Sequence, residues 1–192
     1  MSPSPIRILD TQVISDRWAV LKTVTVEQTR RDGSVRVFTR EAYDRGNGAV
    51  VLLYHRASRT VALTRQFRLP SYVNGNPTGF LIEACAGMLD TDTPEVCIRR
   101  EVQEETGFVI GEVTRIMEAY LSPGALTEKL TFFTAEYFPA SRVGPGGGIA
   151  NEDIEVLELP FDEAYALIAS GGIRDAKTIL LLQYAKLHGL VG

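Results

Sequence analysis

Three carboxylates stand close together near the middle of the chain, at Glu101, Glu104 and Glu105. Residues three and four apart in a helix lie on the same side, so these side chains project towards one region. Like charges at that spacing repel each other, and a divalent cation reverses the penalty, because Mg²⁺ and Mn²⁺ prefer carboxylate oxygens. The spacing therefore predicts a metal site, with Glu101 and Glu105 as the best-placed ligands and Glu104 as a helper. The alternative is a solvated acidic face.

The helix that must carry these carboxylates has signals at both ends. Thr93 suits the N-cap, Pro94 suits the first helical position, and Gly107 is placed to end the helix in a left-handed conformation. We therefore predict one short helix between Thr93 and Gly107.

The segment around this helix resembles the Nudix box, the motif of the Nudix hydrolase family. The box pattern is Gly, five residues, Glu, seven residues, then Arg-Glu-apolar-any-Glu-Glu-any-Gly-apolar, and Arg100 to Phe108 match its second half at every specified position. The first half, from Gly87, is one residue short, and either Asp92 or Thr93 stands where the family has a glutamate that pairs with the box arginine. The resemblance implies that the backbone carbonyl of Ala86 completes the metal site.

Segments outside the box are similar to the GDP-mannose hydrolase branch of this family, from about Ile8 to about Leu187. Examples are Arg40 to Gly48, Arg65 to Arg68 and Glu155 to Pro160. A proline such as Pro123 also marks the related ADP-ribose pyrophosphatases. The resemblance implies Mg²⁺-dependent hydrolysis of GDP-mannose to GMP and mannose 1-phosphate, with Mn²⁺ as a possible replacement. ADP-ribose or another nucleoside diphosphate sugar is the nearest alternative substrate, and a non-catalytic nucleotide-sugar sensor is a second alternative.

Two further carboxylates are candidates for activating water. Glu152 follows a glycine-rich stretch, from which it could reach over a diphosphate, and the resemblance implies that it also contacts metal and substrate. Glu128 matches a second active-site glutamate of the branch and is the alternative base. Gly144 to Gly148 precede no helix and no Gly-Lys-Ser/Thr, so they predict a mobile loop rather than a phosphate cradle.

Cationic and aromatic side chains are the candidates for holding the substrate. Lys177 falls in the first turn of the last predicted helix, where the helix dipole disfavours a cation unless an anion binds there. Arg40 and Arg68 are candidate anion contacts, and Trp18 could stack on the guanine. The resemblance implies substrate contacts from Trp18, Thr39, Arg40, Glu41, Arg68, Ala86, Gly87, Met88, Glu105, Glu128, Glu152 and Lys177.

Composition limits the other possibilities. The 192 residues are 45% hydrophobic and 23% charged with a net charge of −4, which is typical of a globular protein and gives no electrostatic footprint for nucleic acid. No apolar run reaches membrane-spanning length and the start lacks a signal peptide, so we expect a cytoplasmic protein without a membrane partner. Cys85 and Cys97 are expected to be buried free thiols.

The remaining elements predict an α/β architecture, consistent with a Nudix α/β/α sandwich over residues 46–192. Residues 1–45 form a separate extension, in which Trp18–Arg30 and Val35–Tyr43 are expected to pair as an antiparallel hairpin. An isolated two-stranded ribbon is marginal in water, and the resemblance implies that this hairpin is exchanged across a homodimer. The other predicted strands lie at about 49–55, 60–67, 80–85, 112–121, 130–138 and 154–159, and the last two helices at about 161–171 and 175–187.

Overall fold

A computed structural model describes residues 5–149 and 152–191 and divides the chain into two compact units. Unit 1 comprises Met1–Asn47 with Ser122–Lys129, and unit 2 comprises Gly48–Leu121 with Leu130–Gly192. The division after residue 45 stays a prediction.

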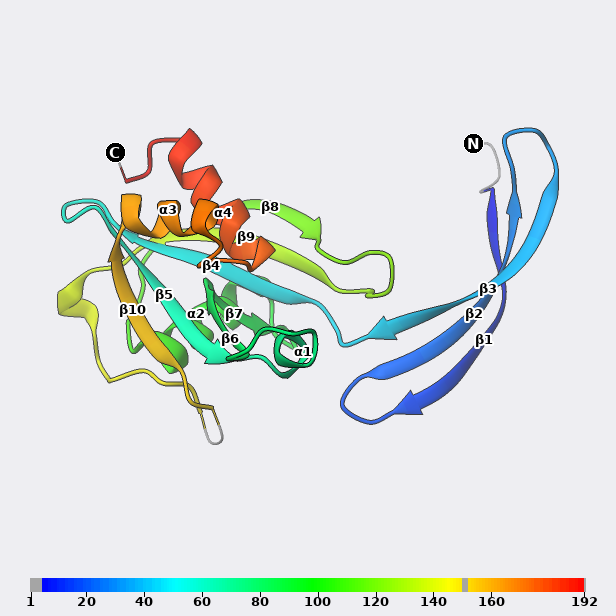
Figure 1. The fold of residues 1–192 in the computed structure, drawn as a ribbon, viewed down its shortest axis with the longest axis horizontal. Helices are drawn as coiled ribbons and strands as arrows, with labels where there is room; N and C mark the ends of the chain where they lie inside the picture. The colour runs from blue at the N-terminus through cyan, green and yellow to red at the C-terminus, as the bar shows by residue number, and fades with distance from the viewer. Residues whose placement is uncertain (1–4, 150–151, 192) are drawn as a thin grey trace. The chain divides into compact units, whose positions relative to one another are not determined.

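Unit 1 contains a three-stranded antiparallel sheet in the order β1-β2-β3 (Figure 1). The predicted hairpin is confirmed as β2 (Val20–Thr29) and β3 (Val35–Asp44), and an additional strand, β1 (Ile6–Asp16), pairs with the outer edge of β2. Gly33 adopts a φ of 82° in the turn between β2 and β3, a conformation that glycine accepts without strain.

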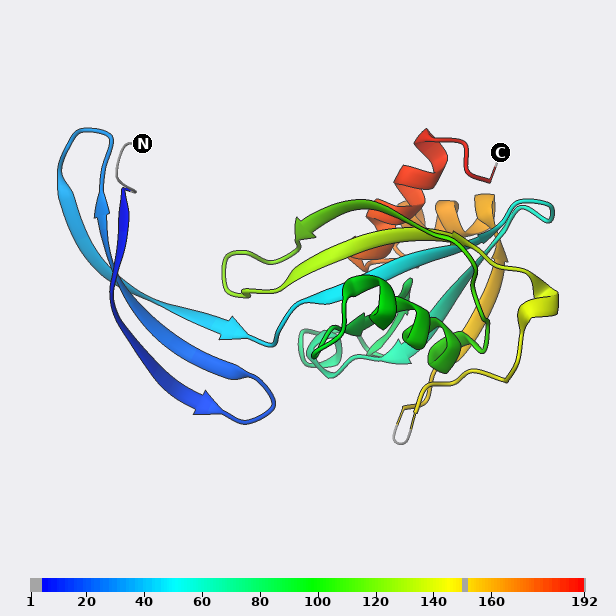
Figure 2. The same ribbon diagram turned by 180° about the vertical axis from the view of Figure 1, so that it is seen from behind.

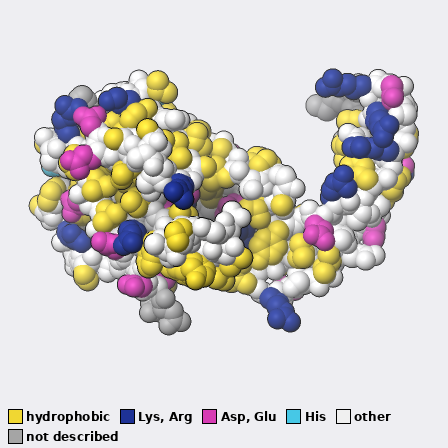
Figure 3. Space-filling view, in the orientation of Figure 1, with side chains coloured by type: hydrophobic (Ala, Val, Ile, Leu, Met, Phe, Trp, Pro, Cys, Tyr) yellow, Lys and Arg dark blue, Asp and Glu magenta, His cyan; other side chains and the backbone are white. Residues whose placement is uncertain are grey.

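A row of apolar side chains crosses one face of this sheet, and no second layer covers the row among the described residues of unit 1. Ile8 pairs with Val26, and Val26 pairs with Phe38, so the three side chains form a row across the strands. Ile8 is 65% exposed. Figure 3 shows hydrophobic side chains among the basic ones along these strands.

Unit 2 is built on a seven-stranded mixed sheet. Five strands follow the order β10-β5-β4-β9-β8, while β6 pairs with β5 and β7 pairs with β4; the β4–β9 pair is parallel. The strands are β4 (Gly48–His55), β5 (Thr60–Phe67), β6 (Phe80–Glu83), β7 (Cys85–Met88), β8 (Val113–Tyr120), β9 (Lys129–Glu136) and β10 (Glu155–Pro160).

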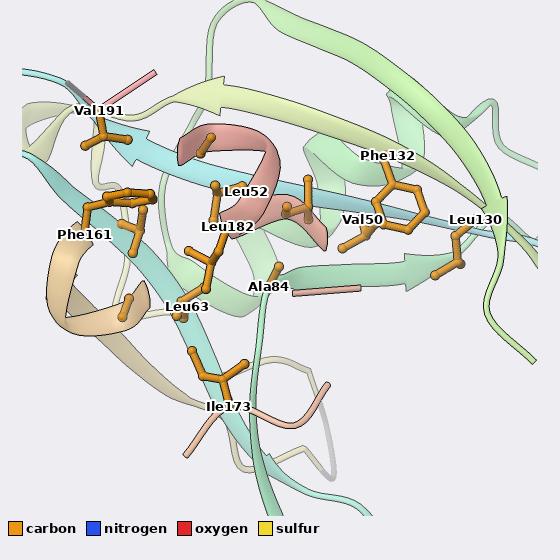
Figure 4. Close-up of a cluster of buried hydrophobic side chains, with 14 residues drawn as sticks. Val50, Leu52, Leu63, Ala84, Leu130, Phe132, Phe161, Ile173, Leu182 and Val191 are labelled. Atoms are coloured by element: carbon orange, nitrogen blue, oxygen red, sulfur yellow. The ribbon is translucent and has the colours of Figure 1, made fainter. Parts of the chain in front are cut away.

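Helices cover both faces of this sheet, which confirms the predicted α/β/α sandwich. Side chains of a buried strand point alternately to the two faces. Val50 and Leu52 of β4 accordingly pack in the core beneath α3 (Phe161–Ser170) and α4 (Ala176–Leu187), drawn in Figure 4. Val51 and Leu53 pack in the second core, beneath α2 (Pro94–Thr106), seen in front of the sheet in Figure 2.

Three local features differ from the sequence-based expectation or were absent from it. Residues 69–73, for which no element was predicted, form a short helix, α1 (Leu69–Val73), in which no residue is buried. The strand predicted at 80–85 is divided into β6 and β7, and a 3₁₀ turn spans Pro139–Ser141. Cys85 and Cys97 are buried free thiols, as predicted. Among the described residues, no helix combines the length and apolarity needed to cross a bilayer.

Candidate active site

Helix α2 begins and ends as its sequence predicts. The Thr93 side chain accepts a hydrogen bond from the Val96 N–H, Pro94 occupies the first turn, and Gly107 ends the helix with a φ of 75°. The helix turns Cys97, Ile98 and Val102 into the core. These contacts fix the direction in which the carboxylates on the other positions project.

Glu105 lies on the buried side of α2. It is 4% exposed, and its Oε2 atom has no hydrogen-bond partner in the structure. Burial raises the pKa of this carboxyl to about 7, while the Cys85 thiol, as a hydrogen-bond donor, and the Arg68 guanidinium oppose the rise and the charges of Glu101 and Glu152 add to it. A carboxylate oxygen enclosed without a partner is costly, so a ligand is needed to satisfy it.

Glu101 packs directly against β7. A Cβ atom added at Gly87 would collide with the Glu101 carboxylate, so glycine is required for this close approach. Burial raises the pKa of Glu101, and Arg100, whose Nη1 lies 2.9 Å from Glu101 Oε1, opposes the rise. Arg100 Nη1 also lies 3.2 Å from Glu104 Oε2, so one guanidinium offsets the repulsion between two box carboxylates.

The shortened first half of the box keeps the arginine contact. Asp92 Oδ2 lies 3.5 Å from Arg100 Nε, while Thr93 serves as the N-cap. Of the two candidates for the missing glutamate's position, Asp92 is the one that pairs with the box arginine.

The strand β7 brings the other box residues beside α2. Ala86 and Gly87 pair with Val50 and Ala49 of β4, and the Met88 carbonyl accepts a hydrogen bond of 3.2 Å from Cys97 Sγ. The pairing fixes the backbone of Ala86, Gly87 and Met88 at the edge of the carboxylate group.

The glycine-rich segment is bound to the end of α2. The Gly147 N–H donates to the Glu105 carbonyl and the Gly148 N–H to the Glu104 carbonyl, at 2.9 and 3.0 Å. These bonds satisfy carbonyls that the end of a helix leaves unpaired. Glu152 Oε2 in turn accepts the Ile149 N–H at 2.9 Å, and a Cβ atom at Gly148 would collide with this carboxylate.

The two predicted cations of unit 2 converge on one buried carboxylate. Arg68 Nε lies 2.6 Å from Glu83 Oε2, and Lys177 Nζ lies 2.5 Å from Glu83 Oε1 and 2.7 Å from Asp175 Oδ1. Lys177 therefore has two protein counter-ions at the start of α4. Sequence reasoning assigned no role to Glu83, although its interruption of an apolar strand was a visible signal.

The donor set fits a hard divalent cation. As they stand, no three acidic, histidine or cysteine side chains within residues 5–149 and 152–191 are gathered tightly enough to hold a metal ion. Beyond the effect of burial, the charge of Glu152 nevertheless raises the pKa of both Glu101 and Glu105, so the three carboxylates are near one another, and Glu105 offers an unpartnered oxygen. All these donors are oxygens, which Mg²⁺ and Mn²⁺ prefer.

The other sequence-predicted residues belong to unit 1. Trp18 is 71% exposed, and the Arg45 guanidinium lies 5.4 Å from its ring centroid. Arg45 Nε also lies 3.1 Å from Glu128 Oε1. Arg45 therefore links the candidate base-stacking side chain to the alternative catalytic base, a role that the sequence did not reveal.

Thr39, Arg40 and Glu41 are consecutive residues of β3. Thr39 and Glu41 share one face of the strand and Arg40 lies on the other, because side chains alternate. The Arg40 guanidinium lies 5.1 Å from the Phe38 ring centroid.

Comparison with known proteins shows the family. The family model described as "NUDIX domain" matches residues 44–182, and the model described as "GDP-mannose pyrophosphatase NudK N-terminal domain" matches residues 5–43. The chain belongs to the NUDIX family.

Curated relatives extend over almost the whole chain. A GDP-mannose pyrophosphatase of Pectobacterium atrosepticum is 54% identical over 97% of this chain and 96% of its own length. One from Enterobacter sp. (strain 638) is 52% identical over 97% of each chain. A solved structure titled "Crystal structure of ADP compounds hydrolase" shares the fold with a TM-score of 0.71 at 19% identity, covering 98% of both chains.

Proposed function

We propose that this chain is a divalent-metal-dependent pyrophosphatase that hydrolyses GDP-mannose to GMP and mannose 1-phosphate. One observation supports the reaction class: Glu105 has a buried, unpartnered carboxylate oxygen beside Glu101 and beside β7, the strand that contains the box residue Gly87. The substrate follows from relatives at 52–54% identity that are named GDP-mannose pyrophosphatase. A sensor that only binds a nucleotide sugar would not need carboxylates that repel each other, so their presence favours catalysis.

We assign the metal to Glu101, Glu105, Glu152 and the backbone carbonyl of Ala86, with Mg²⁺ as the expected ion and Mn²⁺ as a replacement. A cation held there would neutralise charge on the diphosphate and would lower the pKa of a water at the site. Arg100 limits the repulsion between Glu101 and Glu104 while the site is assembled.

The remaining site residues bind the substrate and move the proton. Glu152 accepts the proton from the attacking water, because the glycine turn presents its carboxylate towards Glu101 and Glu105. Glu128 is the alternative base. Arg68, Lys177 and Arg40 offset the negative charge of the diphosphate, and Trp18 stacks on the guanine, with Thr39, Glu41, Gly87 and Met88 as further contacts.

We propose a homodimer in the cytoplasm as the active form. The apolar row on unit 1 supports this, because an exposed Ile8 on a single-layer sheet is better explained if a second chain covers it. Whether the N-terminal strands are exchanged between the two chains is part of the same proposal.

The substrate proposal is tested by comparing the rates at which the protein hydrolyses two substrates. GDP-mannose and ADP-ribose are supplied separately at equal concentration with Mg²⁺, and products are resolved by anion-exchange chromatography. We expect GMP and mannose 1-phosphate from the first, at a rate well above that of ADP-ribose cleavage. A strong preference for ADP-ribose would overturn the substrate, and binding of GDP-mannose without turnover would favour the sensor.

A further inference from the structure

Glu83 is the feature of unit 2 that the proposed mechanism does not yet use. It lies on β6, is 3% exposed, and pairs in register with Thr64 of β5, whose hydroxyl donates to the Glu83 carbonyl at 3.2 Å. Its backbone is therefore fixed by the sheet. A carboxylate buried this deeply must be compensated by charged partners.

The two oxygens of this carboxylate are divided between two cations. Oε2 contacts Arg68 Nε at 2.6 Å, and Oε1 contacts Lys177 Nζ at 2.5 Å. The partners come from distant parts of the chain: Arg68 directly follows β5, and Lys177 lies in the first turn of α4. One side chain thus fixes the separation between a guanidinium and an ammonium.

Both cations keep N–H donors that Glu83 does not use. Glu83 contacts only the Nε of Arg68, whose two terminal nitrogens belong to a side chain that is 40% exposed. Lys177 carries three N–H donors, and Glu83 and Asp175 accept from it. Both cations therefore retain donors for an anion, at the border of the carboxylate site that Arg68 electrostatically influences.

Stability alone does not account for this arrangement. Replacing a buried ion network by apolar residues is often neutral or stabilising, so such a network is weak evidence for a stabilising role. A network that orients groups for binding has a separate reason to exist, because ligands are held best by donors fixed in advance.

We propose that Glu83 is a positioning residue, which holds Arg68 and Lys177 at the spacing needed to bind the negatively charged diphosphate-sugar end of the substrate. This inference rests on the proposed function. It predicts that Glu83 acts on substrate binding through the two cations and not through the metal-binding carboxylates.

Kinetics of single and combined variants test the inference. We expect Glu83→Gln to raise the KM for GDP-mannose about tenfold or more, the size associated with losing one charge-assisted hydrogen bond, and to change kcat much less. Glu83→Gln added to the double variant Arg68→Ala/Lys177→Ala should cause little further loss, because its targets are gone. Glu158→Gln is the control: this β10 carboxylate contacts Tyr137 and Arg142 away from these groups, and its KM should match wild type.

Folding is monitored by thermal denaturation, and Glu83→Asp provides a second readout if the glutamine variant does not fold. Aspartate keeps the charge but is one methylene shorter, so we expect a raised KM here too. A wild-type KM in either folded variant overturns the inference, as does an undiminished Glu83→Gln effect in the Arg68/Lys177 background. If wild-type protein neither hydrolyses GDP-mannose nor binds GDP by calorimetry, the proposed function itself fails, and this inference with it.

Discussion

Glu105 combines burial with an oxygen that has no protein partner, and both properties have measurable consequences. Its side chain is enclosed by β7 and the core side of α2, so water cannot replace a missing ligand cheaply. The same burial raises the pKa of the Glu105 carboxyl.

Glu105→Gln should reduce kcat for GDP-mannose by two or more orders of magnitude. The substitution preserves shape but removes the charge that we assign to metal binding. Steady-state assays across a Mg²⁺ titration measure this, with Glu158→Gln as a control that leaves β7 and α2 untouched. Full activity in a Glu105→Gln enzyme would refute its assignment as a metal ligand.

The stability of the metal-free protein should depend on the pH through Glu105. Burial raises the pKa of this group from 4.5 to about 7, so the folded state keeps a proton that the unfolded chain releases. Stability due to this group therefore falls as pH rises from about 4.5 to about 7, by about 3 kcal/mol in total. Urea denaturation in the presence of a chelator measures this: between pH 5 and pH 8, the free energy of unfolding of Glu105→Gln should rise relative to that of the wild type.

The effect of Mg²⁺ on the free energy of unfolding tests the same site. At pH 8, Mg²⁺ should stabilise the wild type, because it binds the folded, ionised site, and should stabilise Glu105→Gln much less. Equal stabilisation of both proteins would show that the ion binds elsewhere.

Sequence identified the carboxylates of α2 but not the surroundings of Lys177. Its position at a helix start argued for an external anion but did not reveal that Glu83, distant in sequence, and Asp175 also pair with it. Local reasoning considers only the helix that carries a residue. Long-range pairing is decided by the sheet, which places β6 beside α4.

At the scale of elements, the segment from Gly144 to Gly148 depends on residues with positive φ. Gly146, Gly147 and Gly148 have φ of 73°, 107° and 82°. The sequence predicted a mobile loop here, whereas the described part of it is hydrogen-bonded to the last turn of α2. Glycine content alone cannot distinguish these cases, because it permits both motion and unusual fixed conformations.

Gly148→Ala should reduce kcat at least tenfold, because its Cβ displaces the Glu152 carboxylate that we assign to proton transfer. Gly75→Ala is a matched control: Gly75 also has a positive φ, of 95°, but a Cβ there meets nothing within 4 Å. Both variants should lose roughly 1 kcal/mol from backbone strain. If the two variants had similar kcat values, the proposal that Gly148 positions Glu152 for catalysis would be wrong.

Thr178 joins α4 to the junction of β6 and β7. Its hydroxyl accepts the Ala84 N–H at 2.7 Å and donates to Asp175, so Thr178→Val would leave a buried N–H without a partner. We expect Thr178→Val to lose about 1–3 kcal/mol of unfolding free energy, and Thr178→Ser to retain most of it. Urea denaturation distinguishes the two, and a valine variant as stable as wild type would contradict the argument.

The caps of α2 were predictable from sequence, whereas β1 was not. The Thr93 side chain bonds to the backbone only three residues on, and Gly107 acts through its own backbone conformation, so both carry a local signal. Strand β1 has two irregularities in its pairing, between Ile8 and Asp10 and between Val13 and Ser15, which break the two-residue alternation that reveals a strand.

At the scale of the whole molecule, the single-layer sheet of unit 1 is the main evidence for a partner. The fold class was accessible from the pattern of strands and helices, whereas the order of the strands in the sheet came only from the structure. The proposal that the partner is a second copy of this chain comes from the resemblance, since exposed apolar residues indicate a partner without identifying it.

Ile8→Lys should convert a two-chain species into single chains in sedimentation velocity. A charge on this apolar row is costly if a second chain covers it, whereas a truly exposed site tolerates lysine within about 0.5 kcal/mol. Gln12→Lys is the control, because Gln12 pairs with Thr23 on the opposite face. A wild-type protein that sediments as one chain at all concentrations would refute the proposed dimer.

Unit 1 takes residues from two stretches of the chain, Met1–Asn47 and Ser122–Lys129. The Tyr43 N–H donates to the Ala125 carbonyl, the Tyr43 carbonyl accepts from the Thr127 N–H, and Arg45 pairs with Glu128. A gene shortened to start at residue 46 would leave the second stretch without its backbone partners. The N-terminal strands therefore cannot be exchanged between relatives by themselves. Recombination that moved them would also have to transfer Ser122–Lys129 with Glu128, so we expect the two stretches to be inherited together.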